Sequence, residues 1–156
     1  MSGNDDPTIS IGPENSASLG DEGAVPAPTE RDVLTIGQIV DACKSIERFC
    51  AGHTFDDFAD DDMLSSAVER KIMIIGEAAS PNAKRLNDAF KDAYPEVPWR
   101  QLAGMRNVLA HQYDTVRLRI MWETATNDIP TLRATLEPIL AHEARRLAME
   151  DLGQDE

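Results

Sequence analysis

The sequence has few of the side chains that build disulfide frameworks or metal sites: two cysteines and three histidines among 156 residues. Cys43 and Cys50 are seven residues apart in an apolar helical pattern, with no CxxC spacing. This arrangement argues against a disulfide scaffold and against a thiolate zinc site. It predicts two small residues buried in the core.

The sequence also lacks an apolar run of the roughly 20 residues that a membrane span requires. Its acidic N-terminus has neither the basic start nor the apolar stretch of a signal peptide. We therefore expect a cytoplasmic protein that does not engage a membrane.

Apolar residues that alternate with polar ones, as in strands, are scarce, and apolar positions recur instead at three- and four-residue steps. This periodicity predicts an all-α bundle of about five helices. Pro81 should end the second helix, because proline has no N–H to donate. Ser80 and Asp128 should cap the helices that follow them. The expected helices cover 31–51, 64–80, 81–90, 99–125 and 129–147.

The net charge of −13 is distributed unevenly along the chain. Residues 1–30 hold six acids and no lysine or arginine, and residues 150–156 hold four more acids. The body between them, residues 31–149, has 18 acids against 15 bases. We expect a disordered acidic N-terminal tail over 1–30, a helical domain over 31–149 and an acidic C-terminal tail over 150–156.

Five aspartates are concentrated in one run, at positions 56, 57, 60, 61 and 62. Carboxylates at this density can bind a cation, but the alternating oxygen ligands around a turn glycine that calcium loops use are missing. A solvated acidic loop is the better interpretation.

The stretch GMRNVLAHQYD, residues 104–114, places an arginine, a histidine and a tyrosine among small and aliphatic residues. On a helix with about 100° per residue, one face of 102–111 would point to the core, with Leu102, Met105, Val108 and Leu109. The opposite face would carry a shelf of small residues and polar groups: Ala103, Gly104, Ala110, Arg106, Asn107 and His111. A glycine inside a helix costs roughly 0.5 to 1 kcal/mol relative to alanine, so Gly104 predicts close packing against another helix.

Arg106 and His111 would lie about 140° apart on that helix, which is awkward for binding a single phosphate. Either the helix turns near His111, or two copies of the helix share the site. The plainer alternative is that these polar residues are simply solvated.

Arg106, His111 and Tyr113 fit the pattern Arg-x4-His-x-Tyr, and the segments IIGEAA, YPEVPW and WETATNDIP occur around it. In this order the segments resemble the HepT branch of the HEPN family, and the resemblance spans about residues 31–141. These proteins are toxins of bacterial and archaeal toxin–antitoxin pairs. The resemblance implies a HEPN-type helical bundle that dimerises through the motif helix, with two motifs facing each other across a cleft.

The resemblance further implies a metal-independent endoribonuclease without a cofactor, acting on RNA such as tRNA or mRNA. Arg106 would bind the scissile phosphate and stabilise the charge of the transition state. His111 would be the general base or the general acid. Asn107, Tyr113 and Arg100 would support RNA binding.

The implied partner is an MntA-like minimal nucleotidyltransferase, the antitoxin of a type VII system, which adds AMP to Tyr113. AMP would place bulk and negative charge where an RNA phosphate must bind. Two alternatives stay open. One is a catalytically inactive dimer that serves as AMP acceptor and binding partner, and the other is an inert bundle whose motif only supports packing.

Two features depart from the family pattern. The segment IGEAASPNAKRL carries about four residues more than the usual IGEAAKRL, which introduces Pro81. Four residues are close to one helical turn, so the apolar face can stay in phase, but the helix geometry beside the cleft must differ. The acidic N-terminal segment has no family counterpart.

Overall fold

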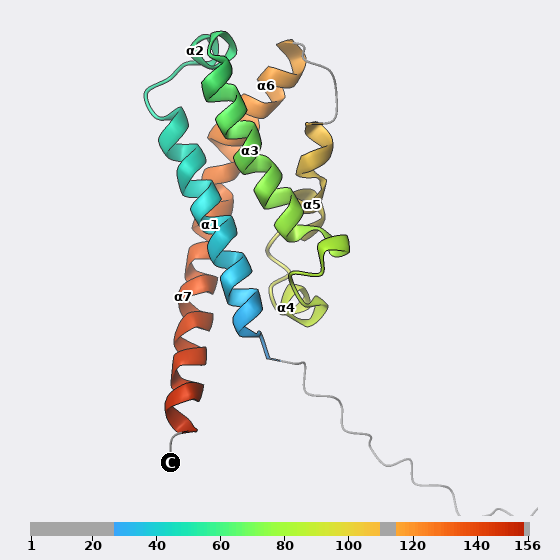
Figure 1. The fold of residues 1–156 in the computed structure, drawn as a ribbon, viewed down its shortest axis with the longest axis vertical. Coiled ribbons are helices and arrows are strands. Elements are labelled where there is room, and N and C mark those ends of the chain that lie inside the picture. Colours follow the sequence, from blue (N-terminus) through green and yellow to red (C-terminus); the bar gives the residue numbers. More distant parts are fainter. Residues whose placement is uncertain (1–26, 110–114, 155–156) are drawn as a thin grey trace, which may run out of the picture.

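The structure, a computed structural model, describes residues 27–109 and 115–154, without the side chain of Val108. These ranges contain seven α-helices, two short helical turns and no strand, which confirms the all-α prediction (Figure 1). Five of the helices are nine residues or longer. The elements are α1 (Glu30–Cys50), α2 (Phe55–Asp60), α3 (Asp62–Ala79), η1 (Pro81–Ala83), α4 (Asp88–Ala93), α5 (Trp99–Val108), α6 (Thr115–Glu123), η2 (Thr124–Asp128) and α7 (Ile129–Gly153).

Helix α3 lies at the centre of the arrangement, between α1 and α5 (Figure 1). On its other side, α1 packs along α7. Helix α2 covers one end of the bundle, where it contacts α3 and α6. None of the helices in the described ranges is long and apolar enough to cross a membrane.

The core confirms the prediction for both cysteines. Cys43 and Cys50 are 0 % and 7 % exposed and carry free thiols. Burial raises the pKa of Cys43 to about 12 and that of Cys50 to about 11. Both thiols therefore stay protonated near neutral pH and behave as small apolar groups.

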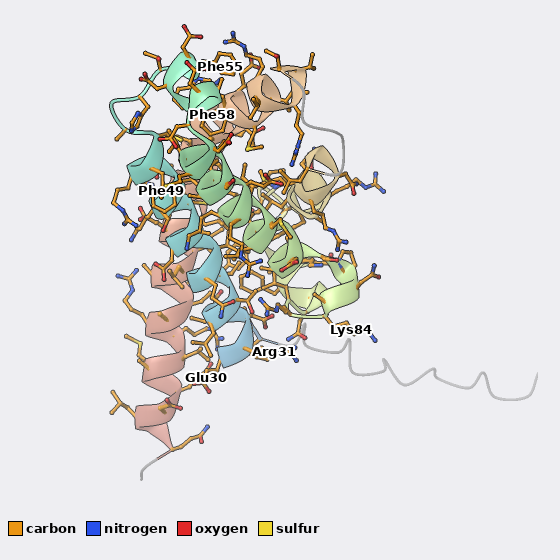
Figure 2. The ribbon with its side chains drawn as sticks, turned by 45° about the horizontal axis from the view of Figure 1, so that its top comes forward. Glu30, Arg31, Phe49, Phe55, Phe58 and Lys84 are labelled. Carbon is orange, nitrogen blue, oxygen red and sulfur yellow. The ribbon has the colours of Figure 1, made fainter. Side chains whose placement is uncertain are left out.

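The acidic run does not form the expected loop. It forms α2 and the start of α3, because Phe58, the apolar residue within the run, is fully buried and draws the segment onto the bundle (Figure 2). The Asp57 carboxylate accepts a hydrogen bond of 2.8 Å from the backbone N–H of Thr54. Asp61 caps α3 by accepting from Met63 N and Leu64 N at 3.0 and 3.1 Å. The carboxylates thus stabilise helix N-termini.

Pro81 ends α3 as predicted, but the helix expected to follow it is broken in two. Only the three-residue turn η1 follows directly, and Lys84 then adopts a left-handed conformation with φ of 49°. Helix α4 begins at Asp88, and the Ser80 side chain makes no capping hydrogen bond. The predicted cap at Ser80 is therefore wrong.

The predicted helix start at Asp128 is also wrong. The chain stays helical from α6 through η2 into α7, because η2 forms a wider π-type turn instead of a break. Asp128 makes no side-chain cap. At its other end α7 passes Leu147 and reaches Gly153, supported by ion pairs of Arg146 with Glu143 and Glu150.

Candidate functional site

A surface groove of about 500 Å³ lies between α5 and the turn η1. It brings together three residues that the sequence predicts for RNA binding: Arg100, Arg106 and Asn107. Ala103 and Gly104, from the predicted small-residue shelf, line the groove between them. The opposite wall comes from the turn after α3, with Ser80, Pro81 and Asn82.

The groove is positively charged in a strongly acidic chain. Its lining contains two arginines and no carboxylate. Arg100 and Arg106 are six residues apart, so their Cα atoms are separated by about 9 Å along the helix axis. Both side chains are exposed, and neither forms an ion pair with a carboxylate in the described part of the chain. Their guanidinium groups are therefore available to an anionic ligand.

A second hollow, of about 460 Å³, lies on the other side of α5 and has the opposite character. Glu96 and Asp128 line it together with Gln101 and Met105, and no lysine or arginine does. Two carboxylates repel a phosphate, so charge selects the arginine-lined groove as the candidate site for RNA.

The N-terminus of α5 is fixed by its first residue. The indole N–H of Trp99 donates to the backbone oxygens of Lys91 and Tyr94 at 3.1 and 3.0 Å. The Trp99 ring also packs edge-on against Phe90, with 5.9 Å between the ring centroids. These contacts hold the first turn of α5, and with it Arg100, against α4.

Gly76 of α3 fixes the position of Arg106. A Cβ atom at Gly76 would lie 3.1 Å from the backbone nitrogen of Arg106 and 3.5 Å from the backbone oxygen of Leu102. A side chain at this position would push α5 away by a few tenths of an ångström, so glycine allows α3 to approach α5 this closely. Sequence reasoning missed this role. The available signal was a glycine inside the mostly apolar last turns of a helix, where it carries a cost in helix propensity.

Gly104, the glycine that the sequence singles out for close packing, is open in this chain. A Cβ atom there would meet nothing within 4 Å among the described residues. The close approach between helices of one chain therefore occurs at Gly76. Any close partner of Gly104 must come from outside the described residues.

His111 and Tyr113 lie outside the described residues, and so does Ala110 of the predicted shelf. Helix α5 ends at Val108, with Leu109 as its C-cap, so the helical projection does not extend as far as His111. The described residues on either side of the segment 110–114 contact the bundle. Leu109 packs against the core, and Arg117 on α6 forms an ion pair of 2.5 Å with Glu69 on α3. Both flanks are therefore held against the bundle that carries Arg106.

No group of three or more histidine, cysteine, aspartate or glutamate side chains in the described ranges is placed to hold a metal ion. The functional groups in the groove are guanidinium, amide and hydroxyl groups. They can hold a phosphate and hydrogen-bond to a nucleotide, whereas proton transfer requires a group from outside this lining.

Fold and groove together define a class: an all-helical protein with a cationic groove suited to a phosphodiester ligand. The sequence matches the family model of HepT-like ribonucleases over residues 39–139, a range that runs from α1 to α7. The chain belongs to this ribonuclease family, which confirms the resemblance found in the sequence.

Two relatives illustrate the similarity. A probable ribonuclease HepT of Thermococcus cleftensis is 40 % identical over 101 residues, which cover 65 % of this chain and 88 % of the relative. A candidate RNase of Caldanaerobacter subterraneus subsp. tengcongensis is 38 % identical over 105 residues, covering 67 % of this chain and 90 % of the relative. No solved structure gave a significant match.

Proposed function

We propose that this protein is the toxin of a type VII toxin–antitoxin pair and acts in the cytoplasm as a metal-independent endoribonuclease. The observation that carries the proposal is the groove itself. In a chain of a ribonuclease family, Arg100, Arg106 and Asn107 line one hollow without a carboxylate. Helix α5, which presents these residues, ends shortly before His111.

The chemistry follows from the residue types. The ribose 2′-oxygen attacks the adjacent phosphorus and gives up its proton to a base, while the bond from phosphorus to the 5′-oxygen breaks and that oxygen takes up a proton from an acid. His111, with an unperturbed imidazole pKa near 6.5, is the base or the acid in this step. Arg106 donates two hydrogen bonds to the phosphate and stabilises its extra charge in the transition state. The products are a 2′,3′-cyclic phosphate and a 5′-hydroxyl.

The proposal includes a homodimer that forms through α5. The open side of Gly104 supports it, because a Cβ atom there meets nothing within 4 Å and this side of α5 is free to face a second copy across the RNA. Two facing copies would double the number of arginines around one RNA strand. This arrangement would concentrate positive charge at the cleft although the chain as a whole is acidic.

Control by an MntA-like nucleotidyltransferase completes the proposal. The transferase would move AMP from ATP to the Tyr113 oxygen: the phenol loses its proton, the bond between the α- and β-phosphates breaks, and pyrophosphate leaves. The motif would then carry a phosphate of its own. It would thereby block the substrate by charge and by bulk. The signature of this step is a mass increase of one AMP group on the peptide that carries Tyr113.

The test is cleavage of tRNA and mRNA by purified protein in the presence of a chelator. We expect the wild type to cut RNA and leave cyclic phosphate ends. His111→Ala should lower kcat/KM at least about 100-fold, as expected when a general acid–base group is removed. Arg106→Ala should lower it by a similar factor, because a donor that stabilises the charge of the transition state is lost. If the folded wild type and His111→Ala are equally inert on both RNAs, the protein is no ribonuclease and the inactive AMP-accepting dimer takes its place.

A further inference from the structure

The turn η1 forms the wall of the groove that faces α5, and its chemistry differs from that of α5. Helix α5 contributes both guanidinium groups of the lining, whereas η1 and the residue before it contribute Ser80, Pro81 and Asn82, which are all uncharged. Charged donors suit phosphate, and amide groups suit the edges of nucleobases. Asn107 on α5 adds a second amide to the groove, but only the η1 wall is free of charge, so it can contact a nucleotide only through hydrogen bonds and van der Waals contacts.

The side chains of Asn82 and Ser80 carry donors and acceptors that no other described residue uses. Asn82 is exposed, and its amide makes no hydrogen bond within the described ranges. Ser80 is only 8 % exposed, yet its hydroxyl caps no helix and has no hydrogen-bond partner among the described residues. The Ser80 hydroxyl is not among the buried polar atoms that lack a partner, so it is accessible from the groove. A ligand in the groove can therefore form a hydrogen bond with it.

The turn is also rigid, which matters for base recognition. The ring of Pro81 fixes the backbone just before Asn82. Two backbone hydrogen bonds close the turn, from Ala83 N to Ser80 O at 3.1 Å and from Lys84 N to Pro81 O at 3.3 Å. Figure 2 shows Lys84 where this turn projects from the bundle.

The chain after the turn is anchored to α1. Thr35 donates to the backbone oxygen of Arg85 at 3.3 Å. The buried carboxylate of Asp32 accepts from the backbone N–H and the side-chain amide of Asn87 at 2.8 and 3.0 Å. With α3 ending just before Ser80, the turn is held on both sides. Asn82 is therefore presented in one fixed position, which lowers the entropy lost when it binds a ligand.

We propose that Asn82, supported by Ser80, determines which nucleobase is accepted beside the cleaved phosphate. This inference rests on the proposed ribonuclease function and assigns its substrate preference. An asparagine amide pairs through two hydrogen bonds with the N6 and N7 edge of adenine. In single-stranded RNA the bases are splayed out and expose such edges. Adenine is therefore the base preferred at this position.

The experiment measures kcat/KM on short single-stranded RNAs in which each nucleotide flanking the cut is varied over all four bases. We expect the wild type to prefer adenine at one flanking position by about 5-fold to 150-fold, the range of one bidentate amide–base pair. Asn82→Ala should reduce this preference to about twofold or less while rates on the other bases change little. Ser80→Ala should weaken the preference in the same direction.

The matched control is Asn127→Ala, which removes an exposed asparagine of η2 outside the groove and should leave the base preference intact. Thermal unfolding of each variant checks that the fold is kept. A wild type without preference at any flanking position would overturn the inference, as would an Asn82→Ala variant that slows cleavage equally on all four bases or keeps the adenine preference.

Failure of the proposed function would look different. Binding of the same RNAs to His111→Ala, followed by fluorescence anisotropy, reports on the groove without cleavage. If the folded wild type cuts none of the RNAs and His111→Ala binds none of them, the ribonuclease proposal itself is wrong. If RNA is cut but the base preference does not depend on Asn82, only the assignment of Asn82 is wrong.

Discussion

The position of Arg106 depends on a residue that never touches the groove. Gly76 lies on α3, where a Cβ atom would come within 3.1 to 3.5 Å of Arg106 and Leu102 on α5. Because the neighbouring atoms on α5 belong to the backbone, they cannot rotate out of the way as a side chain would. A methyl group at position 76 must therefore displace the helix that carries Arg106.

Gly76→Ala should lower both stability and activity. We expect a loss of about 1 to 3 kcal/mol in unfolding free energy, the usual cost of an inserted methyl group in a packed site. We also expect a drop in kcat/KM for RNA cleavage at temperatures where the variant is fully folded, because Arg106 is moved relative to the phosphate. Denaturant unfolding and cleavage assays at one temperature separate the two effects.

Gly37 of α1 is the matched control, because a Cβ atom there would have its nearest contact at 4.0 Å, the Cδ1 atom of Leu140. Gly37→Ala should raise stability by about 0.5 to 1 kcal/mol, the gain in helix propensity. Cleavage should remain at the wild-type rate. A Gly76→Ala variant as stable and active as the wild type would show that α5 tolerates the displacement.

At the scale of elements, apolar periodicity predicted the long helices, and the missing N–H of Pro81 predicted the end of α3. It missed the events that depend on contacts distant in sequence. The acidic run becomes helical because Phe58 finds a buried site beside Trp122, with 5.3 Å between the ring centroids. Asp128 was predicted to cap a new helix, but the chain stays helical through η2 into α7. Both η2 and α7 pack against α1, so the helix has no break at Asp128.

The candidate site was also predictable only in part, because local spacing shows which residues share a helix face but not which other element packs beside them. Arg100, Arg106 and Asn107 lie on one helix, so their shared face follows from helical spacing. Ser80 and Asn82 enter the groove from a turn about 20 residues earlier, and only the packing of α3 on α5 brings them there. Spacing within one element cannot reveal a wall that another element contributes.

Two capping boxes in the described ranges differ in whether the capping carboxylate also binds a residue outside its own helix. Thr54 and Asp57 form one at the exposed start of α2. Thr29 and Asp32 form the other at α1, where the Asp32 carboxylate is 1 % exposed and also binds Asn87. The first box stabilises a single helix end, and the second ties α1 to the chain that leads from η1 into α4.

Asp32→Ala should therefore destabilise the protein far more than Asp57→Ala. Removing the buried Asp32 carboxylate removes its two hydrogen bonds from Asn87 as well as the cap of α1, and we expect a loss of about 1.5 to 3 kcal/mol, the range for hydrogen bonds to a charged group. In Asp57→Ala the backbone N–H of Thr54 loses its acceptor but is exposed and can bind water, so the loss in unfolding free energy should be much smaller. Denaturant unfolding of both variants makes the comparison. Equal losses would mean that the contact with Asn87 contributes nothing.

On the scale of the whole molecule, charge is segregated. The groove lining carries two arginines and no acid, whereas residues 1–30 carry six acids and no base. The chain as a whole stands at −13. The groove arginines would attract an RNA at short range, whereas the net negative charge of the chain would repel it at long range. Salt screens the long-range repulsion more strongly than the contacts inside the groove.

Removing residues 1–26 tests this balance, because five of the six acids lie there. The cut must stop before Ala27, since the Pro28 backbone oxygen accepts a hydrogen bond from Arg146 and Thr29 caps α1. We expect the melting temperature to stay within about 2 °C of the full chain, because no contact of the described core is removed. RNA binding by the His111→Ala background should tighten severalfold at about 0.05 M salt and converge with the full chain near 0.5 M, as the Debye length falls to a few ångströms.

A full-length variant with the same five acids changed to asparagine or glutamine separates charge from bulk. If repulsion is the cause, this variant should bind RNA as tightly as the truncated chain at low salt, although its length is unchanged. If only the truncated chain binds more tightly, the segment obstructs the groove by its bulk. Identical binding by all three proteins at every salt concentration would show that the N-terminal acids do not influence the groove, leaving Arg100 and Arg106 to set its field alone.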